Sequence, residues 1–527
     1  MQARVGRFVM VVVGVLLVAV AVTALVAPRR PFTIYDQPVV IGVTAVFLLV
    51  GLLWRPPSWL RRVLRASWVP WVVALLGGWL GVVVGTSMRF TYSWDVGVAF
   101  RLARILRTDS QLTEGQVAYL SRYPNTHPLV SVHRAAYAIA DATGWDVQTV
   151  LGSLGGIAAG LTILLIHPLV ARVAGRVRAV AAQLVVVALV ATSPWTAVPY
   201  TDLLAMPLLT GAVVLVLRAA HRRDRLGLAQ LLASAALAAG AIVLKTTPAV
   251  LVVAVAVVGL LLAVDLRATR RDALVALGGT VVWGVVTLAL VASMSASATA
   301  ALGSTANDRM RTDATPPTLW WVANGMTPTK SPGNPTRYGG YNGVMLRAIS
   351  AMDTEEATAW SREWIRTQLV SRDAGDLALF YANKAAWNWG DGMFWAWGEG
   401  KDSEPDKLEP AHGIGRLVQA VDGLHGRWYP LRADLAQGLW VALLLVTGVG
   451  ALRARAPSRD VLLLGLTVLG IGAFTLVFQG RSRYLLTFVP LVVALGAMVR
   501  QRPLRLLGRL GRGGPVSRST ESGPAPT

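Results

Sequence analysis

Long apolar runs recur along this chain of 527 residues and limit its possible folds more than any other feature. Each run has about 17–25 residues, enough to cross about 30 Å of hydrocarbon as a helix. Helices are favoured because every backbone N–H and C=O must be satisfied within its segment, and the alternating pattern of a membrane β-barrel is absent. We therefore predict an all-α polytopic membrane protein with about 12 transmembrane helices. The predicted spans are 8–27, 38–54, 68–86, 147–170, 179–198, 202–218, 228–244, 247–264, 273–293, 434–452, 460–478 and 484–499.

The charge of the chain fits a membrane setting better than a nucleic-acid partner. The formal net charge is +22, yet only 15% of the residues are charged and 54% are hydrophobic. Most arginines stand in short segments between apolar runs, where anionic lipid headgroups are their expected partners. Cysteine is absent, which excludes disulfides and cysteine-ligated metals. We expect membrane lipids as partners and no nucleic acid.

The arginine-rich connections predict the orientation of the chain. By the positive-inside rule, the side that receives them is cytoplasmic. This assignment requires 128–146, which is only weakly apolar, to be a surface or re-entrant element rather than a span. The first span resembles a signal peptide, but its apolar length favours an uncleaved anchor. The connections on the predicted cytoplasmic side are 55–67, 171–179, 221–225, 265–273, 453–459 and the tail from Arg500.

The opposite side receives most of the unusual polar residues. We therefore expect a multi-pass protein of the plasma (inner) membrane with its functional site on the extracytoplasmic face. The predicted organisation is an additional N-terminal two-helix membrane segment (1–67), a transmembrane core (68–293) with an outer loop at 87–146, an outer Trp-rich loop or small domain (294–433), C-terminal transmembrane helices (434–500) and a basic, disordered cytoplasmic tail (501–527).

Asp95 is the first candidate for chemistry, because it follows a predicted span closely and should lie near the membrane surface. One interpretation is that Asp95 caps an amphipathic helix anchored among lipid headgroups. Another is that its carboxylate lies at the mouth of a cavity and accepts a proton from an attacking hydroxyl. The two interpretations are not exclusive. The predicted helix has Val96, Phe100, Ala103 and Leu106 at helical spacing, with Arg101, Arg104 and Arg107 around them.

Further candidates stand at other outer tips of the predicted spans. Asp202 in PYTD opens a span, where a carboxylate either caps the helix or faces protein or a watery cavity. Lys245 in LKTTP is either a snorkelling lysine or a cation for a phosphate near the headgroups. The tip QGRSRY adds two arginines, which suit bidentate phosphate binding or ordinary headgroup contact. The remaining candidates for substrate or donor binding are Arg122, Tyr123, Asn125 and His127 in the predicted turn LSRYPNTHPL, and Arg481, Arg483 and Tyr484 in the last tip.

The long outer loop 294–433 is unusually aromatic, since it holds nine of the 19 tryptophans. These side chains either anchor a small domain on the bilayer or pack a lid that stacks on a sugar ring. Asp391 is a candidate polar contact for a substrate in that lid. The sequence lacks closely spaced histidine pairs and the glycine-rich phosphate loops of nucleotide enzymes. We therefore expect no cofactor and favour chemistry without a metal, although metal dependence stays open.

Together these features resemble the GT-C superfamily of integral-membrane glycosyltransferases, which use polyprenyl-phosphate sugars and include protein mannosyltransferase and aminoarabinose transferase types. The resemblance covers roughly 68–500 and implies that Asp95 acts as general base or orients the acceptor. The adjacent second acid found in many members is missing, so Asp202 is the candidate for the second catalytic carboxylate. The resemblance is carried by YSWD, SRYPN, PYTD, LKTTP, NWGDGMFWAWGEG and RSRYLLTFVPL, as in uncharacterised Gram-positive members.

The predicted activity is therefore transfer of a sugar from a polyprenyl-phosphate donor to an extracytoplasmic acceptor, which is a cell-wall glycan, a lipid or a protein. Lys245, Arg481 or Arg483 would neutralise the charge that develops on the leaving phosphate. The main alternative is a multi-span transporter or flippase, which usually carries ionisable residues near the bilayer midplane. A non-catalytic scaffold that binds wall polymer is a third possibility.

Overall fold

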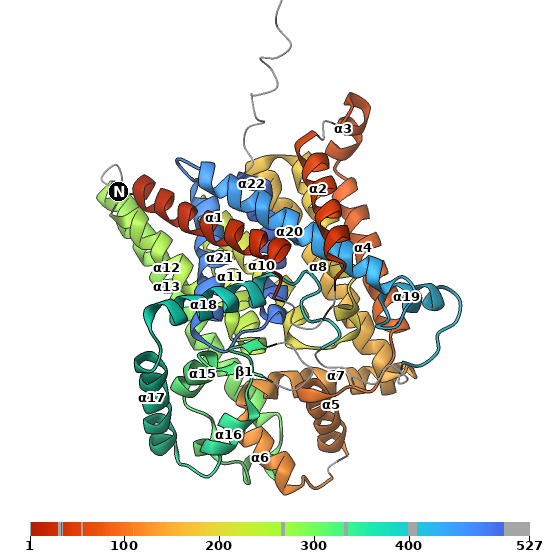
Figure 1. Cartoon of the computed structure of the whole chain (residues 1–527), viewed down its shortest axis with the longest axis vertical. Helices are drawn as coiled ribbons and strands as arrows, with labels where there is room; N and C mark the ends of the chain where they lie inside the picture. The colour runs from red at the N-terminus through yellow and green to blue at the C-terminus, as the bar shows by residue number, and fades with distance from the viewer. Residues whose placement is uncertain are drawn as a thin grey trace, which may run out of the picture.

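The computed structural model describes residues 2–29, 33, 35–53, 56–108, 110–264, 269–330, 336–398 and 408–499. A bundle of long helices forms the body of the molecule, and a group of short helices, here called the cap, covers one end (Figure 1). The cap consists of residues 94–108, 110–143, 304–330 and 336–389. The predicted tail 501–527 lies outside the described residues.

The long apolar segments form helices, and the all-α polytopic membrane fold is confirmed. Within the described ranges, nine helices are long and apolar enough to cross a membrane, and two shorter apolar helices cover Gln37–Gly51 and Thr247–Ala263. The bundle helices are α1 (Gln2–Val26), α2 (Gln37–Leu53), α4 (Val69–Ser87), α8 (Val147–Ala174), α9 (Arg176–Val186), α10 (Thr201–Ala219), α11 (Arg225–Leu244), α12 (Val250–Ala263), α13 (Arg270–Ala300), α20 (Tyr429–Arg453), α21 (Arg459–Val477) and α22 (Val489–Val499).

One predicted span, 179–198, is not a single regular helix. The α9 helix gives way to a π-helical turn at Val187–Ala191, and a 3-10 turn follows at Pro194–Ala197. Proline has no backbone N–H and disfavours a helical conformation in the residue before it, so Pro194 ends the regular hydrogen bonding. The prediction of a span through 198 is therefore wrong, because apolar composition alone does not report this break.

Short helices make up the connections. As predicted, 128–146 does not form a long apolar helix; it contains α7, which lies across the end of the bundle (Figure 1). Two-residue strands β1 (Pro328–Thr329) and β2 (Arg337–Tyr338) pair antiparallel. The short helices are α3 (Ser58–Arg65), α5 (Trp94–Arg107), α6 (Glu114–Arg122), α7 (His127–Thr143), α14 (Ser304–Asn307), α15 (Thr318–Gly325), α16 (Gly343–Ile349), α17 (Thr354–Val370), α18 (Ala374–Trp389) and α19 (Ile414–Asp422).

Helices α4 and α8 approach each other closely along a seam of glycines. A Cβ atom added to Gly81 would lie 2.9 Å from Cα of Gly156, and one added to Gly85 would lie 2.5 Å from the carbonyl oxygen of Gly152. Small residues spaced four apart allow such contact between membrane helices. Helix α4 precedes loop 87–146 and helix α8 follows it. The glycine seam between these helices therefore brings the two ends of the loop together.

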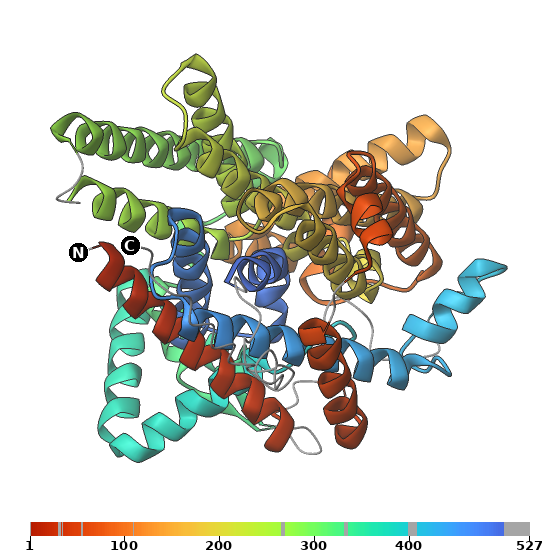
Figure 2. The same ribbon diagram turned by 90° about the horizontal axis from the view of Figure 1, so that it is seen from above.

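The remaining helices surround α10 and α22. Seen from above, α22 lies near the centre of the molecule, and the layer formed by α11, α12 and α13 extends to one side (Figure 2). The N-terminal pair packs on the C-terminal helices, with α1 against α20 and α21, and α2 against α20. The arginine-rich helix α3 lies at the end of the bundle opposite the cap (Figure 1). The residues of the predicted outer loops that lie near the cap are therefore at one end of the bundle, opposite the arginine-rich α3, as the sequence predicts.

The tryptophans of 294–433 mostly fill the interior of the protein. Trp320, Trp387, Trp389, Trp395 and Trp397 are buried, whereas Trp428 is 47% exposed. A small core inside the cap forms around Trp320, Met345, Leu346 and Ile349, and Tyr123 of the first outer loop packs against it. The structure thus favours packing over bilayer anchoring for most of these side chains, and it joins the two outer segments into one cap.

Candidate functional site

Asp95 occupies the first turn of α5, with both carboxylate oxygens hydrogen bonded. The helix begins at Trp94 and its N-cap residue is Ser93, so the interpretation of Asp95 as the N-cap is wrong. The hydroxyl of Tyr119 donates to Oδ1 at 2.9 Å, and the hydroxyl of Tyr200 donates to Oδ2 at 3.0 Å. Burial and the Asp95 charge raise the pKa of Tyr119, which keeps its hydroxyl protonated as a donor.

Local backbone geometry brings Asp95 to this position. Trp94, which is 49% exposed, has φ of 53°, a left-handed conformation that is strained for a bulky side chain. A Cβ atom added to Gly97 would lie only 2.2 Å from the carbonyl oxygen of Tyr92. The first turn of α5 can therefore fold back onto the preceding segment only because residue 97 is glycine.

Asp202, in the first turn of α10, lies between two cations. Its side chain is completely buried; Oδ1 lies 3.0 Å from Nζ of Lys245, and Oδ2 lies 3.4 Å from Nε of Arg483. Neither oxygen accepts a hydrogen bond from the described residues, so the carboxylate depends on these two ion pairs. Asp202 is not the N-cap of α10 either, because Tyr200 occupies that position.

Two tyrosine rings connect the carboxylates. The guanidinium carbon of Arg483 lies 4.5 Å from the ring centre of Tyr200, whose hydroxyl holds Asp95. Nζ of Lys245 lies 5.9 Å from the same ring and 4.1 Å from that of Tyr484. Cations at these distances are attracted to the face of an aromatic ring. The structure therefore brings Asp95, Asp202, Lys245, Arg483 and Tyr484 into one cluster, with Tyr200 at its centre.

The last tip of the chain is attached to the cap by backbone hydrogen bonds. The N–H of Gln479 donates to the carbonyl of Trp321, and that of Gly480 to Gly339. Nearby, the buried Nζ of Lys384 donates to three carbonyls, those of Gly325, Leu476 and Phe478. These bonds hold the segment that carries Arg481 and Arg483, and they connect it to the segment around α15.

Arg481 contacts a different pair of aromatic rings from Arg483. Its guanidinium lies 5.6 Å from the rings of both Trp94 and Trp395, and the side chain is only 4% exposed. Trp395 has φ of 60°, and its neighbour Phe394 has φ of 52°. Trp94, Phe394 and Trp395 account for the left-handed non-glycine residues among those described, and all three lie near Arg481 or the segment it contacts. Such strain is typical of functional sites.

Asp391 organises the segment around Trp395. Its buried carboxylate accepts hydrogen bonds from the hydroxyls of Tyr35 and Ser482 and from the N–H groups of Met393 and Trp395. Burial raises the pKa of this carboxyl, and the four donors favour its charged form. The arrangement indicates that Asp391 positions the Trp395 segment relative to Ser482.

The candidates of the LSRYPNTHPL turn have different positions. Nε2 of the buried His127 lies 3.0 Å from the carbonyl oxygen of Leu120, and Nδ1 lies 2.9 Å from the hydroxyl of Thr299. Tyr123 contacts Tyr341 through its hydroxyl, whereas Asn125 is exposed and Arg122 is half-buried. These four residues do not join the Asp95 cluster through any hydrogen bond or ion pair described in the structure; substrate binding by them stays a prediction.

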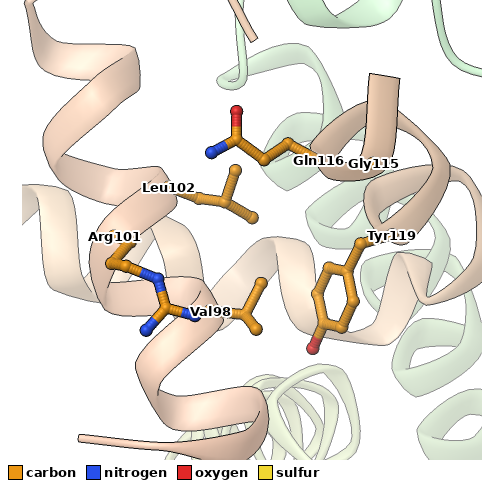
Figure 3. Close-up of a pocket in the computed structure, with 6 residues that line it drawn as sticks. All are labelled: Val98, Arg101, Leu102, Gly115, Gln116 and Tyr119. Carbon is orange, nitrogen blue, oxygen red and sulfur yellow. The ribbon is translucent and has the colours of Figure 1, made fainter. Parts of the chain in front are cut away.

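A cleft of about 220 Å³ lies between α5 and α6, and one of its lining residues, Tyr119, donates its hydroxyl hydrogen bond to Asp95. The side chains that line it come from both helices, and the ring of Tyr119 extends across it from α6 (Figure 3). No group of three or more His, Asp or Glu side chains suited to a metal ion occurs in the described part of the chain. The lining residues are Val98, Arg101, Leu102, Gly115, Gln116 and Tyr119.

Sequence reasoning missed several residues of the cluster. Tyr119 and Tyr200 have no motif of their own, although Tyr200 stands directly before Thr201-Asp202 in a segment that was singled out. The glycine at position 97 offers a weak signal, since a glycine inside an amphipathic helix indicates a close backbone approach. Asp95, Tyr119 and Tyr200 lie far apart in the chain, so the sequence alone does not indicate that they meet.

Fold and site together define an all-helical polytopic membrane protein with a polar site at one end of its bundle. A family model described as conserved hypothetical integral membrane protein matches residues 8–503, and the chain belongs to this family. Among solved structures, the chain is similar to ArnT from Cupriavidus metallidurans bound to undecaprenyl phosphate, at 13% identity and a TM-score of 0.32, covering 82% of this chain and 78% of that chain. No curated protein matches the sequence.

Proposed function

We propose that this protein is a membrane glycosyltransferase of the GT-C type, which transfers a sugar from a polyprenyl-phosphate donor to a hydroxyl acceptor outside the cytoplasm. The observation that carries the proposal is the contact of Tyr200 with both parts of the site. Its hydroxyl holds Asp95, and its ring contacts Arg483. A potential base and the cations for a leaving group are thereby joined by one side chain.

In the proposed reaction, the acceptor oxygen attacks the anomeric carbon of the sugar. The new C–O bond forms as the bond between that carbon and the phosphate oxygen breaks. The acceptor proton goes to the Asp95 carboxylate, and the electron pair of the broken bond remains on the leaving phosphate. General base catalysis of this kind contributes typically 10²–10⁴-fold to a rate.

Lys245 and Arg483 are proposed to bind the donor phosphate. Ammonium and guanidinium groups stabilise the charge that develops on a leaving phosphate, and their effect is strong where water is largely excluded. Arg483 is only 6% exposed. Asp202, paired with both cations and completely buried, is proposed to position them rather than to take the acceptor proton.

The location of the cluster suits a donor that is part lipid and part sugar. Lys245 follows the last residue of α11, and Arg483 precedes α22, so both cations stand at ends of bundle helices. A prenyl tail can then remain beside the bundle while the sugar lies under the cap. We assign this end to the extracytoplasmic face of the plasma membrane, since the arginine-rich α3 lies at the opposite end.

The test is an assay of the purified protein in vesicles that contain polyprenyl-phosphate sugars with a radiolabelled sugar. We expect release of free polyprenyl phosphate and loss of label from the lipid, both of which require Asp95. A protein that moves intact donor between leaflets without breaking it would be a flippase, and this result would replace the proposed function.

A further inference from the structure

The cleft between α5 and α6 is connected to the proposed base by one side chain. Tyr119 lines the cleft and donates its hydroxyl hydrogen bond to Asp95 at 2.9 Å. In Figure 3, the Tyr119 hydroxyl and the Gln116 amide lie towards opposite ends of the cleft. A molecule in the cleft would therefore lie along the Tyr119 ring with one end close to the carboxylate.

The walls of the cleft combine an apolar surface with the amide of Gln116. Val98 and Leu102 supply the apolar part, and a Cβ atom added to Gly115 would meet nothing within 4 Å, which shows open space there. Oε1 of Gln116 accepts the N–H of Thr113 at 2.8 Å, and this bond turns the amide NH2 group away from Thr113. The amide is thereby presented as a donor (Figure 3).

Arg101 gives the cleft a positive charge. The side chain is exposed, and no carboxylate oxygen of the described residues lies within 4.0 Å of it. Nearby charged groups have partners of their own: Arg107 pairs with Asp141, and Glu114 pairs with Arg309. A guanidinium suits an oxyanion, and phosphate matches its geometry well. In Figure 3 the Arg101 guanidinium lies beside Val98 and away from the Gln116 amide, so the two donors would contact different parts of a bound molecule.

We propose that this cleft is the acceptor subsite and that it binds a hydroxyl compound carrying a phosphate ester, with the phosphate at Arg101 and the hydroxyl towards Asp95. The inference rests on the proposed function, which supplies the reaction at Asp95. A soluble phosphate ester and a phosphatidylglycerol headgroup share this chemistry, since each presents a phosphate next to free hydroxyls. Tyr119 then acts as a positioning residue through Asp95.

The first experiment measures binding and does not depend on sugar transfer. Glycerol 1-phosphate and glycerol are compared as probes by saturation-transfer NMR with the full-length protein in phosphatidylcholine nanodiscs. We expect the phosphate ester to bind more tightly, and Arg101→Gln to weaken it about tenfold, as for one charge-assisted hydrogen bond. The matched control is Arg104→Gln, which changes an exposed arginine of the same helix that does not line the cleft.

Equal affinities in the Arg101→Gln and Arg104→Gln variants would overturn the subsite. Loss of probe binding in Arg483→Gln but not in Arg101→Gln would do the same, because the anion would then occupy the Lys245 and Arg483 cluster. Nanodiscs that contain phosphatidylglycerol distinguish a lipid headgroup from a soluble phosphate ester as the ligand of the cleft. Competition with the probe in the wild type but not in Arg101→Gln identifies the lipid headgroup as occupant, whereas absence of competition identifies a soluble ester.

A second variant separates this inference from the proposed function. Tyr119→Phe keeps the ring in the cleft and removes the hydrogen bond to Asp95, so we expect unchanged probe affinity and a lower kcat for sugar transfer. Sugar transfer that persists without Arg101-dependent binding would overturn the acceptor subsite alone. Arg101-dependent binding without transfer from any donor would overturn the proposed function.

Discussion

The two carboxylates of the cluster differ in burial and in the charge of their partners. Asp95 is half-buried and is held by two neutral hydroxyls, those of Tyr119 and Tyr200. Asp202 is completely buried and is held by two cations, Lys245 and Arg483. The charge of Asp202 is therefore balanced by two cations, whereas both hydrogen-bond donors to Asp95 are neutral.

The position of an acid at the end of a span therefore does not define its role. Both residues stand in the first turn of a helix on the same end of the bundle, and the sequence treats them as a catalytic pair. Their partners separate them into a proposed base and a proposed counter-ion. Variants at these residues and their partners test this division.

Asp95→Asn should have the largest effect on activity. The amide has nearly the shape of the carboxylate but cannot take the acceptor proton, so we expect the rate of sugar transfer to fall about 10²–10⁴-fold. Unfolding midpoints should change little. Asp313→Asn, which alters an exposed acid paired with Arg311, serves as the control and should transfer sugar normally. Full activity of the Asp95→Asn variant would remove the general base from the mechanism.

Asp202→Asn should affect stability more than chemistry. Removal of this charge leaves Lys245 and Arg483 without their shared carboxylate, and breaking a buried ion pair typically costs about 3–5 kcal/mol. We expect a lower thermal midpoint in detergent and a higher KM for the donor. If instead the variant keeps its stability and donor KM but loses kcat, Asp202 would be the base.

Acid should lower the stability of the folded state through His133, which contacts the residue before Tyr200. This buried imidazole contacts the Pro199 carbonyl through Nε2, next to Tyr200, and burial lowers its pKa to about 4. Because the usual value is near 6.5, the folded state is fully stabilised above pH 6.5 and loses this stability as the pH falls towards 4. The loss amounts to at most about 3 kcal/mol. Unfolding measured between pH 7 and 4 should show this dependence, and His133→Gln should reduce it.

Tyr200→Phe should have the smallest effect on activity. It tests directly whether the Asp95 side of the cluster acts separately from the cations that Asp202 holds. The ring that faces Arg483 and Lys245 is kept, while the hydrogen bond to Asp95 is lost. A hydrogen bond to a charged group contributes about 1.5–3 kcal/mol, so we expect kcat to fall about 10–100-fold with donor KM unchanged. Tyr200→Leu removes the ring as well and should also raise the donor KM; equal KM values would show that the ring does not support the cations.

Much of the architecture can be predicted from the sequence, because it depends on properties of short segments of the chain. Apolar length determines most spans, and the arginine-rich connections separate the two ends of the bundle. These two local signals predict that Asp95, Asp202, Lys245 and Arg483 lie at one end. The error at 179–198 has a local cause too, since Pro194 interrupts a run that is otherwise apolar enough to cross.

The contacts of the site could not be obtained in this way. Tyr119 and Tyr200 meet Asp95 from two other segments, and a single tyrosine has no property in sequence that reveals such a partner. The glycine seam between α4 and α8 was accessible in principle, because Gly81 and Gly85 face Gly156 and Gly152 at matching four-residue spacing. Reading that pattern would have predicted that the two ends of loop 87–146 meet.

The three carbonyls that surround Lys384 have a consequence for how the protein is made. They belong to Gly325, Leu476 and Phe478, so this ammonium group finds all its partners only after α21 has left the ribosome. Asp95 is synthesised early, whereas Arg483 comes close to the end of the chain. A nascent or truncated chain therefore contains the acid without its cationic neighbours and is expected to be inert. Biosynthesis itself would delay any reaction until the last helices are in place.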